Sequence, residues 1–388
     1  MLWLNFIHLY QPANSPSHRI KEAVDKSYYR LTRLLEEHAD LSFTANISAC
    51  LLERLRDENY QDLLDRWRLL IKAGRLELVG SAAYHAFLPF LPEEEIIYQI
   101  KQQEKMVLEI LGVDIRGNGF FSPEMSYTPA LARIIKKLGY RWLIVGEASL
   151  PDGVSISADS AYTDLNSDLK IIVRQRDFSN AYAPDIITDL LNRQSPFSLL
   201  ITATDAELYG LRHEDPTAEL EKMVKMSQLS TKTISDFLNS VTSLTPVKFR
   251  SASWETNWPE DEGRPFRIWF DHHNKIQRHL WRLTNLALAA GKKYKDDENY
   301  YWYRWHLNRG LASCMFWWAS GRDFFHNFGP RAWNPDEVEN GLNDLLRSVR
   351  SLHNSESRRE KLLAERLAAK IRLQLWRFHW RQHWGIKK

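Results

Sequence analysis

The sequence lacks the features that mark secreted, disulfide-linked and membrane-spanning proteins. Its 388 residues include only two cysteines, Cys50 and Cys314, which lie far apart and suggest a reducing compartment rather than a disulfide framework. The opening segment MLWLNFIHLYQP has neither a basic stretch nor a small-residue cleavage site, so no signal peptide is expected. No apolar run reaches the length of a membrane span. Together these absences predict a cytoplasmic protein with no membrane partner.

Several motifs of cofactor and metal chemistry are missing as well. The sequence contains no Gly-rich phosphate loop, no G-x-S-x-G nucleophile elbow, no H-E-x-x-H and no cysteine pair. His272 and His273 lie in the segment FDHHNK and are expected to face solvent or a neighbouring side chain. The sequence therefore predicts no cofactor and no metal ligand.

The charge is nearly balanced overall, at +3, but it is unevenly distributed. Residues 358–388 hold ten Lys and Arg against two Glu, which on charge alone could indicate a polyanionic partner. The same segment contains Trp376, Phe378, Trp380 and Trp384, which favour a helix docked on the protein. We therefore expect no nucleic-acid partner; the sequence does not indicate an oligomeric state.

Short apolar runs alternate with longer helical patterns over the first two thirds of the chain. Such alternation predicts a parallel β/α architecture, and runs that are apolar on both faces suit strands covered by helices. Seven or eight such units favour a closed barrel over an open sheet. The expected strands span residues 2–9, 41–47, 75–81, 118–122, 141–147, 169–175 and 197–205, with a further candidate at 247–254.

The pattern changes after about residue 258, where the chain becomes helical, aromatic and basic. The polar segment 258–266, with its two prolines and its glycine, is typical of a boundary loop. We therefore expect a catalytic barrel domain over residues 1–260 and a C-terminal helical domain over 261–388 that contributes to the active-site cleft. The expected helices of the barrel domain span residues 20–38, 48–73, 92–111, 128–138 and 184–193, with a long helical stretch over 214–240.

Polar residues gather where the predicted strands end. In β/α barrels the loops at the carboxyl ends of the strands converge on one mouth and carry catalysis. A single polar residue after a strand is usually a helix cap, but the bias recurs at all seven strands. In chain order these residues are His8, Gln11, Asn46, His85, Glu124, Glu147, Arg176, Asp177, Asp205 and Glu207.

Two of the carboxylates come straight after apolar strands. Glu124 lies in FFSPEMSY and Asp205 in LLITATDAELYG. A retaining glycosidase needs a nucleophilic carboxylate and an acid/base carboxyl group about 5 Å apart. The acid needs a raised pKa, which burial and a neighbouring negative charge such as Glu207 would favour. The alternative is that both residues cap the helices that follow.

Five short segments, taken together, resemble the motifs of glycoside hydrolase family 57. The first four are HLYQP, GRLELVGSAAYHAFLPFL, GFFSPEMSY and TDAELYG, and the fifth, LASCMFWWASG, lies in the helical region. VRQRDFSNA resembles a further family segment that places an Arg and an Asp near the sugar. The sequence departs from the family pattern at two places. In the fifth motif Cys314 or a neighbour replaces an Asp, and after DAELYG the residues Leu211 and Arg212 replace histidines.

The resemblance implies an incomplete (β/α)7 barrel followed by a C-terminal helical bundle. It also implies a retaining mechanism on α-glycosidic bonds without a metal. It assigns the nucleophile to Glu124 and the acid/base to Asp205. The expected substrate is α-glucan or maltooligosaccharide, cleaved in the manner of an α-amylase. The expected substrate-binding residues are His8, Gln11, Glu77, His85, Arg176, Asp177, Glu207, Trp254, Trp258 and Trp317.

Three alternatives stay open on the sequence alone. The first is a 4-α-glucanotransferase, branching enzyme or α-galactosidase of the same family. The second is a metal-dependent deacetylase or α-mannosidase on a related barrel, and the third is a non-catalytic protein that binds glycans.

Overall fold

The chain folds into two structural units. The computed structural model describes residues 1–154, 156, 161–193, 198–322, 324–325 and 332–385. The first unit comprises Met1–Ala83 and Leu88–Trp254, and the second comprises Tyr84–Phe87 and Glu255–Lys388. The domain boundary expected at residues 260/261 stays a prediction, as does the contribution of the helical domain to the active-site cleft.

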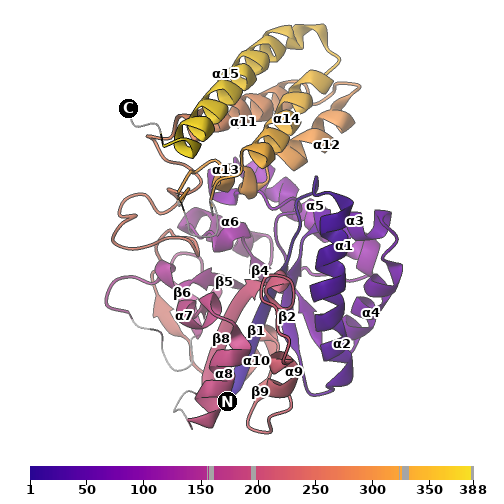
Figure 1. The fold of residues 1–388 in the computed structure, drawn as a ribbon, viewed down its shortest axis with the longest axis vertical. Helices are drawn as coiled ribbons and strands as arrows, with labels where there is room; N and C mark the ends of the chain where they lie inside the picture. The colour runs from indigo at the N-terminus through magenta and orange to yellow at the C-terminus, as the bar shows by residue number, and fades with distance from the viewer. Residues whose placement is uncertain (155, 157–160, 194–197, 323, 326–331, 386–388) are drawn as a thin grey trace. The chain divides into compact units, whose positions relative to one another are not determined.

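Within the described residues of the first unit, seven parallel strands form two sheets (Figure 1). One sheet has the order β3-β2-β1-β8, and the other contains β7-β5-β4. The strands are β1 (Leu2–Leu9), β2 (Phe43–Ile47), β3 (Leu76–Leu78), β4 (Gly119–Phe121), β5 (Trp142–Gly146), β7 (Lys170–Arg174) and β8 (Leu199–Asp205).

The two sheets meet at both edges, which closes the ring. Beyond β3, Gly80 pairs in parallel with Phe120, and the Phe121 amide donates to the Gly80 carbonyl at 2.8 Å. Beyond β7, the Gln175 amide donates to the Ile201 carbonyl at 3.1 Å, and the Ile201 amide donates to Gln175 Oε1 at 2.9 Å. The predicted α/β barrel with parallel strands is therefore confirmed.

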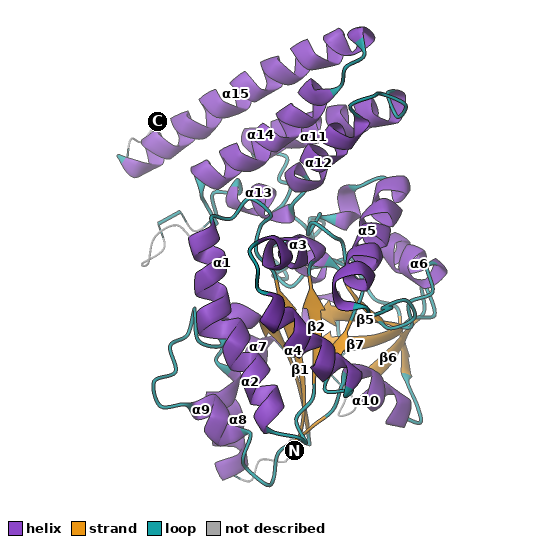
Figure 2. Ribbon diagram, turned by 90° about the vertical axis from the view of Figure 1, so that its right-hand side faces the viewer, coloured by secondary structure: helices purple, strands orange, loops and turns teal. Residues whose placement is uncertain are grey.

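Helices cover the outside of these strands (Figure 2). A π-helical turn at Val24–Tyr28 joins α1 to α2 without a break. α5 follows Pro92, and the three glutamates of its first turn lie at the positive end of the helix dipole. The helices are α1 (Ser17–Ala23), α2 (Tyr29–Glu37), α3 (Ala49–Asp57), α4 (Gln61–Lys72), α5 (Glu93–Leu111), α6 (Pro129–Lys137), α7 (Arg176–Asn180), α8 (Ala183–Asn192), α9 (Glu219–Met223) and α10 (Ile234–Ser240).

Four local predictions need correction. The helix expected at 48–73 is two helices, α3 and α4, separated by residues 58–60. The candidate strand at 247–254 is wrong, since only its first residue belongs to β10 (Thr245–Val247), which pairs with β6. The stretch 214–240 is not one helix: α9 and α10 are separated by β9 (Ser230–Thr231), because the Thr233 hydroxyl caps a new helix start. β6 (Ala161–Asp164), antiparallel to β7, was not predicted. The first residue of the strand predicted at 197–205 lies outside the described residues.

Side chains alternate between the two faces of each strand, which separates two apolar cores. On β1, Leu4 and Phe6 join an inner cluster with Ile201 and Ala203 of β8. Ile7, the residue after Phe6, belongs instead to a second cluster between the strands and the helices. An even-numbered residue of β1 therefore faces the inside of the barrel.

The described part of the second unit is mostly helical. α12 packs on α14, and α11 packs on α15. The inner face of α15 buries Ala364, Ala368, Ile371 and Leu375, which confirms the docked helix predicted for the basic segment; its last residues, 386–388, lie outside the described chain. The helices are α11 (Lys275–Lys293), α12 (Tyr300–Gly310), α13 (Ser313–Trp318), α14 (Pro335–Ser351) and α15 (Arg358–His383).

No described helix in either unit combines the length and the apolar character that crossing a membrane requires.

The two cores give a direct test of which leucines hold the barrel together. Leu4 is fully buried in the inner cluster, whereas Leu69 on α4 is 68% exposed. Leu4→Ala should lower the free energy of unfolding by about 2–5 kcal/mol because it leaves a cavity. Leu69→Ala should change it by no more than about 0.5 kcal/mol. Denaturant unfolding of both variants measures the difference, and equal losses would contradict the assigned core.

Candidate active site

Four strands present a polar side chain to the inside of the barrel at or near their carboxyl ends. His8 on β1 lies in register with Asn46 on β2 and with Asp205 on β8, and all three continue the inward-facing rows of their strands. Arg174, the last residue of β7, lies two positions beyond the inward-facing Ile172. The strand pleat thus gathers these four polar groups at the carboxyl end of the barrel interior.

His8 is a buried, neutral member of this group. Its Nδ1 lies 2.9 Å from Asn46 Oδ1. Burial lowers the pKa of His8 to about 4, although the nearby Asp205 carboxylate acts in the opposite direction. Near neutral pH the imidazole therefore offers hydrogen bonds without adding a charge.

Glu124 is held by backbone strain and by Trp254. It follows β4 in a tight turn at Pro123–Met125, with the left-handed φ of 63° that non-glycine residues rarely adopt. Trp254 Nε1 donates to Glu124 Oε2 at 2.9 Å, and the Trp254 amide donates to the Glu124 carbonyl at 3.2 Å. Only 7% of Glu124 is exposed, so its carboxylate has a fixed direction.

Trp254 connects Glu124 to the groups around Asp205. The Trp254 ring lies edge-on to His8, with 6.5 Å between ring centroids. The Arg174 guanidinium lies over the same ring at 5.5 Å, and Arg174 also acts electrostatically on Asp205. The two carboxylates, from the ends of β4 and β8, are thus linked through Trp254 and its neighbours His8 and Arg174.

Asp205 forms an ion pair with Arg212, whose Nη1 lies 2.6 Å from Oδ2. Burial acts to raise the pKa of Asp205, but Arg212, His8 and Arg174 outweigh it and hold the pKa below its usual range. The raised pKa expected from the sequence is therefore wrong for the free protein. Burial favours the raised pKa, but the two arginines, which the sequence does not place beside Asp205, lower it.

The pKa of Glu207 shifts in the opposite direction, although Glu207 lies only two residues from Asp205. Its Oε1 accepts hydrogen bonds from Gln11 Nε2 at 2.7 Å and from the Tyr28 hydroxyl at 2.5 Å. Burial raises the pKa of Glu207, with Arg212 opposing the shift and Asp205 adding to it. Gln11 and Glu207 therefore lie together in a buried layer beside Asp205.

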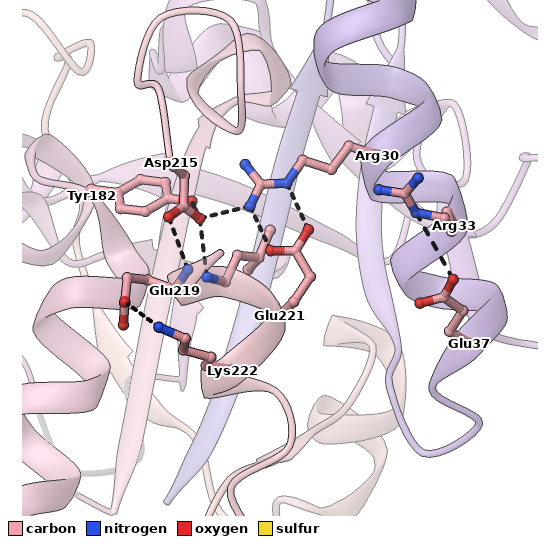
Figure 3. Close-up of polar contacts among 9 residues, drawn as sticks. Arg30, Arg33, Glu37, Tyr182, Asp215, Glu219, Glu221 and Lys222 are labelled. Atoms are coloured by element: carbon pink, nitrogen blue, oxygen red, sulfur yellow. Dashed lines mark hydrogen bonds and ion pairs between the residues drawn. The ribbon is translucent and has the colours of Figure 1, made fainter. Parts of the chain in front are cut away.

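A cluster of charged residues secures the chain that follows β8 (Figure 3). Arg30 on α2 donates to Asp215 at 2.6 Å and to both carboxylate oxygens of Glu221 at 2.8 and 2.6 Å. Asp215 also accepts from the Tyr182 hydroxyl at 2.8 Å and from the Glu219 amide at 2.8 Å. This cluster, here called the Arg30 clasp, fixes the segment that carries Glu207 and Arg212.

Glu77 does not lie with the other predicted residues. Its carboxylate accepts from the Thr44 hydroxyl at 2.8 Å and from the Ser235 amide at 3.2 Å, and it also accepts from the Ser235 hydroxyl. Thr44 precedes Asn46 by two residues on β2, so Glu77 belongs to the layer nearer the amino ends of the strands. It binds the first turn of α10, which suggests a structural role.

The remaining predicted residues divide between the two units. Arg176 begins α7, where its amide donates to Glu147 Oε2 at 3.1 Å, and the neighbouring Asp177 is exposed. His85 belongs to the second unit, where its Nδ1 lies 2.8 Å from the Ser313 hydroxyl. Ser313 begins α13, which also carries the half-buried Trp317.

Trp258 is half-buried in the loop after Trp254 and also belongs to the second unit.

Arg174 and Arg212 are not among the site residues predicted from the sequence. A charged residue in an inward-facing position at the end of an apolar strand would have indicated Arg174. The ion pair of Arg212 depends on a loop whose path the sequence does not reveal.

A parallel β/α barrel with polar groups at its carboxyl face is the architecture of a large class of enzymes. A family model described as Glycosyl hydrolase family 57 matches residues 4–249. The chain belongs to this family.

The relatives confirm the kinship over shorter segments. The chain is 31% identical over 147 residues to a 4-alpha-glucanotransferase of Thermococcus litoralis and, equally, to an Alpha-amylase of Pyrococcus furiosus. Each match covers 37% of this chain but only 22% of the relative. A solved GH57-type branching enzyme from Pyrococcus horikoshii shares the fold at a TM-score of 0.72 and 16% identity, over 97% of this chain and 95% of the other.

The buried neutral His8 predicts a pH dependence of stability. Its folded pKa of about 4 lies below its ordinary value of 6.5, so the unfolded chain binds the proton more tightly. The stabilisation is complete above the unfolded pKa and is lost as the pH falls towards the folded one. Between about pH 7.5 and about pH 5 this residue should account for a loss of about 2 kcal/mol.

Denaturant unfolding at the two pH values measures this loss. In His8→Asn the difference between the two pH values should shrink by that amount. An unchanged difference would show that His8 titrates normally in the folded protein.

Proposed function

We propose that this protein is a retaining glycoside hydrolase that cleaves α-glucosidic bonds in α-glucan. The observation that carries the proposal is the shared surroundings of Glu124 and Asp205. Glu124, after β4, binds Trp254, whose ring contacts His8 and Arg174. His8 and Arg174 in turn act electrostatically on Asp205 at the end of β8. Membership of glycosyl hydrolase family 57 supports it independently.

In the first step Glu124 is the nucleophile. Its carboxylate oxygen bonds to the anomeric carbon while the bond from that carbon to the leaving oxygen breaks, and Asp205 gives its proton to that oxygen. The hydrogen bond from Trp254 and the strained turn point the carboxylate before substrate arrives. This fixed direction spares the reaction the cost of ordering a mobile side chain.

In the second step water replaces the enzyme at the anomeric carbon. Asp205, now ionised, takes a proton from the water as its oxygen attacks, and the bond to Glu124 breaks. The low pKa of Asp205 in the free protein suits this ionised state. For the first step its pKa must rise, which requires Arg212 to leave the carboxylate once substrate fills the site.

The other residues receive roles in holding the sugar. The neutral His8, with Arg176 and Asp177 at the start of α7, would bind hydroxyl groups at the cleavage subsite. Gln11 and Glu207 would support Asp205 from the buried layer. Trp254 would also offer a ring face to the C–H face of a pyranose.

His85, Trp258 and Trp317 belong to the second unit, and the role in sugar binding expected for them from the sequence stays a prediction. Glu77 has no part in this scheme because its carboxylate binds the first turn of α10.

The names of the relatives support α-glucan as the substrate, but they indicate different reactions on it. Two relatives are named as a 4-alpha-glucanotransferase and an Alpha-amylase, and the solved structure is a branching enzyme. Transfer differs from hydrolysis only in the acceptor of the second step, where a sugar hydroxyl takes the place of water. The proposal is hydrolysis, and the product analysis described below separates it from transfer.

The two carboxylate roles can be tested by removing each charge with an isosteric amide. Glu124→Gln and Asp205→Asn should each lower turnover of an α-glucoside by at least about a hundredfold. For Asp205→Asn the loss should be smaller on a substrate with an activated leaving group, because that group needs no proton. Initial rates on maltoheptaose and on an aryl α-maltoside measure both effects.

Glu109→Gln is the matched control, since Glu109 is an exposed residue on α5 paired with Lys105. It should retain full activity. Undiminished turnover in either active-site variant would remove that residue from its role. Activity that a chelator abolishes would favour the metal-dependent alternative.

Product analysis decides between hydrolysis and transfer. With maltoheptaose as sole substrate, the proposal predicts shorter maltooligosaccharides and one new reducing end for each bond broken. Products longer than the substrate, without new reducing ends, would indicate a transferase. Cleavage of an aryl α-galactoside in preference to glucan would indicate an α-galactosidase.

A further inference from the structure

Arg212 occupies an unusual position for a residue that only stabilises the fold. Its side chain is 58% exposed, yet it forms a 2.6 Å ion pair with Asp205, whose side chain is 26% exposed. Ion pairs this accessible to water contribute little to stability, about 0–1 kcal/mol. The surrounding loop is already fixed by the Arg30 clasp. The position of Arg212 therefore calls for a functional reason.

The charges around Asp205 make the ion pair an obstacle to the proposed acid step. The charged and titratable groups that act on Asp205 and Arg212 are Arg174, His8, Glu207 and Tyr28. Burial keeps His8 neutral and favours the neutral forms of Glu207 and Tyr28. Once Asp205 takes up a proton, two arginines remain beside a neutral carboxyl group.

An anion from the substrate would remove this obstacle. It would pair with the guanidinium that Asp205 gives up, and it would balance the excess positive charge. A guanidinium donates two parallel hydrogen bonds to a phosphate as readily as to a carboxylate. The long, exposed side chain of Arg212 can turn from one partner to the other without moving the backbone.

We propose that Arg212 forms an anion subsite beside Asp205, so that the enzyme prefers α-glucosides carrying a phosphate ester near the scissile bond over neutral ones. The phosphate takes the guanidinium from Asp205, and the carboxyl group is then free to accept the proton it delivers. Arg174, which is only 8% exposed and lies over Trp254, keeps its place and adds positive potential. This inference rests on the proposed function.

The test compares two substrates of equal length: neutral maltoheptaose and maltoheptaose with one 6-phosphate per molecule. The wild type should show a kcat/KM about tenfold or more higher for the phosphorylated substrate, as expected for one additional charge-assisted interaction. Arg212→Gln should abolish this preference. The variant Arg212→Lys keeps the charge but not the two-pronged donor, and it should retain part of the preference.

The pH profile separates a role at Asp205 from a merely structural one. On the neutral substrate, Arg212→Gln should move the alkaline limb of kcat/KM to higher pH, because Asp205 loses the cation that keeps it ionised. Arg33→Gln is the matched control, since Arg33 is an exposed arginine on α2 whose partner is Glu37 (Figure 3). It should change neither the substrate preference nor the profile.

Two outcomes would overturn the anion subsite while leaving the proposed function intact. One is a wild type that cleaves the neutral substrate at least as well as the phosphorylated one. The other is an Arg212→Gln variant that loses the same factor on both substrates. If the folded wild type cleaves neither substrate nor any other α-glucoside, the proposed function itself fails, and the anion subsite fails with it.

Discussion

The arrangement of the site depends on the alternation of side chains along parallel strands in a closed barrel. Because successive residues face opposite sides, each strand can fill the core with apolar groups and still present one polar group inward near its last position. His8, Asn46, Arg174 and Asp205 all occupy such positions. A register slip of one residue on β1 would turn His8 outward among the helices. Closure of the barrel therefore aligns the site as well as the core.

Burial then acts differently on each ionisable group in the cluster. It favours the neutral form of His8 and the protonated form of Glu207, whereas the arginines keep Asp205 ionised. The pKa values of two carboxyl groups two residues apart thus shift in opposite directions, because Arg212 is hydrogen-bonded to Asp205 whereas Glu207 accepts from Gln11 and Tyr28. Glu124, outside the strands, depends instead on backbone strain and on Trp254. Pleat, burial and strain each supply one part of the geometry.

The sequence predicted the parts that follow from local patterns. Apolar runs located the seven parallel strands, and the carboxyl-end rule listed His8, Asn46, Glu124 and Asp205, which lie at or just after the ends of four of them. Glu77 was misplaced because motif resemblance does not show which layer of the barrel a strand residue occupies.

The charge on Asp205 was mispredicted for a different reason. Arg212 reaches it through the path of a loop, and loop paths depend on tertiary contacts such as those of Arg30. Long-range partners of this kind leave no periodic signal.

The pairing of β1 with β8 has a consequence for how the chain reaches its native state. Leu2 pairs with Leu199, so the first strand cannot complete its ladder until the eighth has been made. At translation rates of about 5–20 residues per second, β1 waits roughly 10–40 seconds with one edge unsatisfied. Such distant contacts also slow folding itself. Through that interval the nascent chain exposes an apolar strand edge, the kind of surface that chaperones recognise and that drives aggregation when they are scarce.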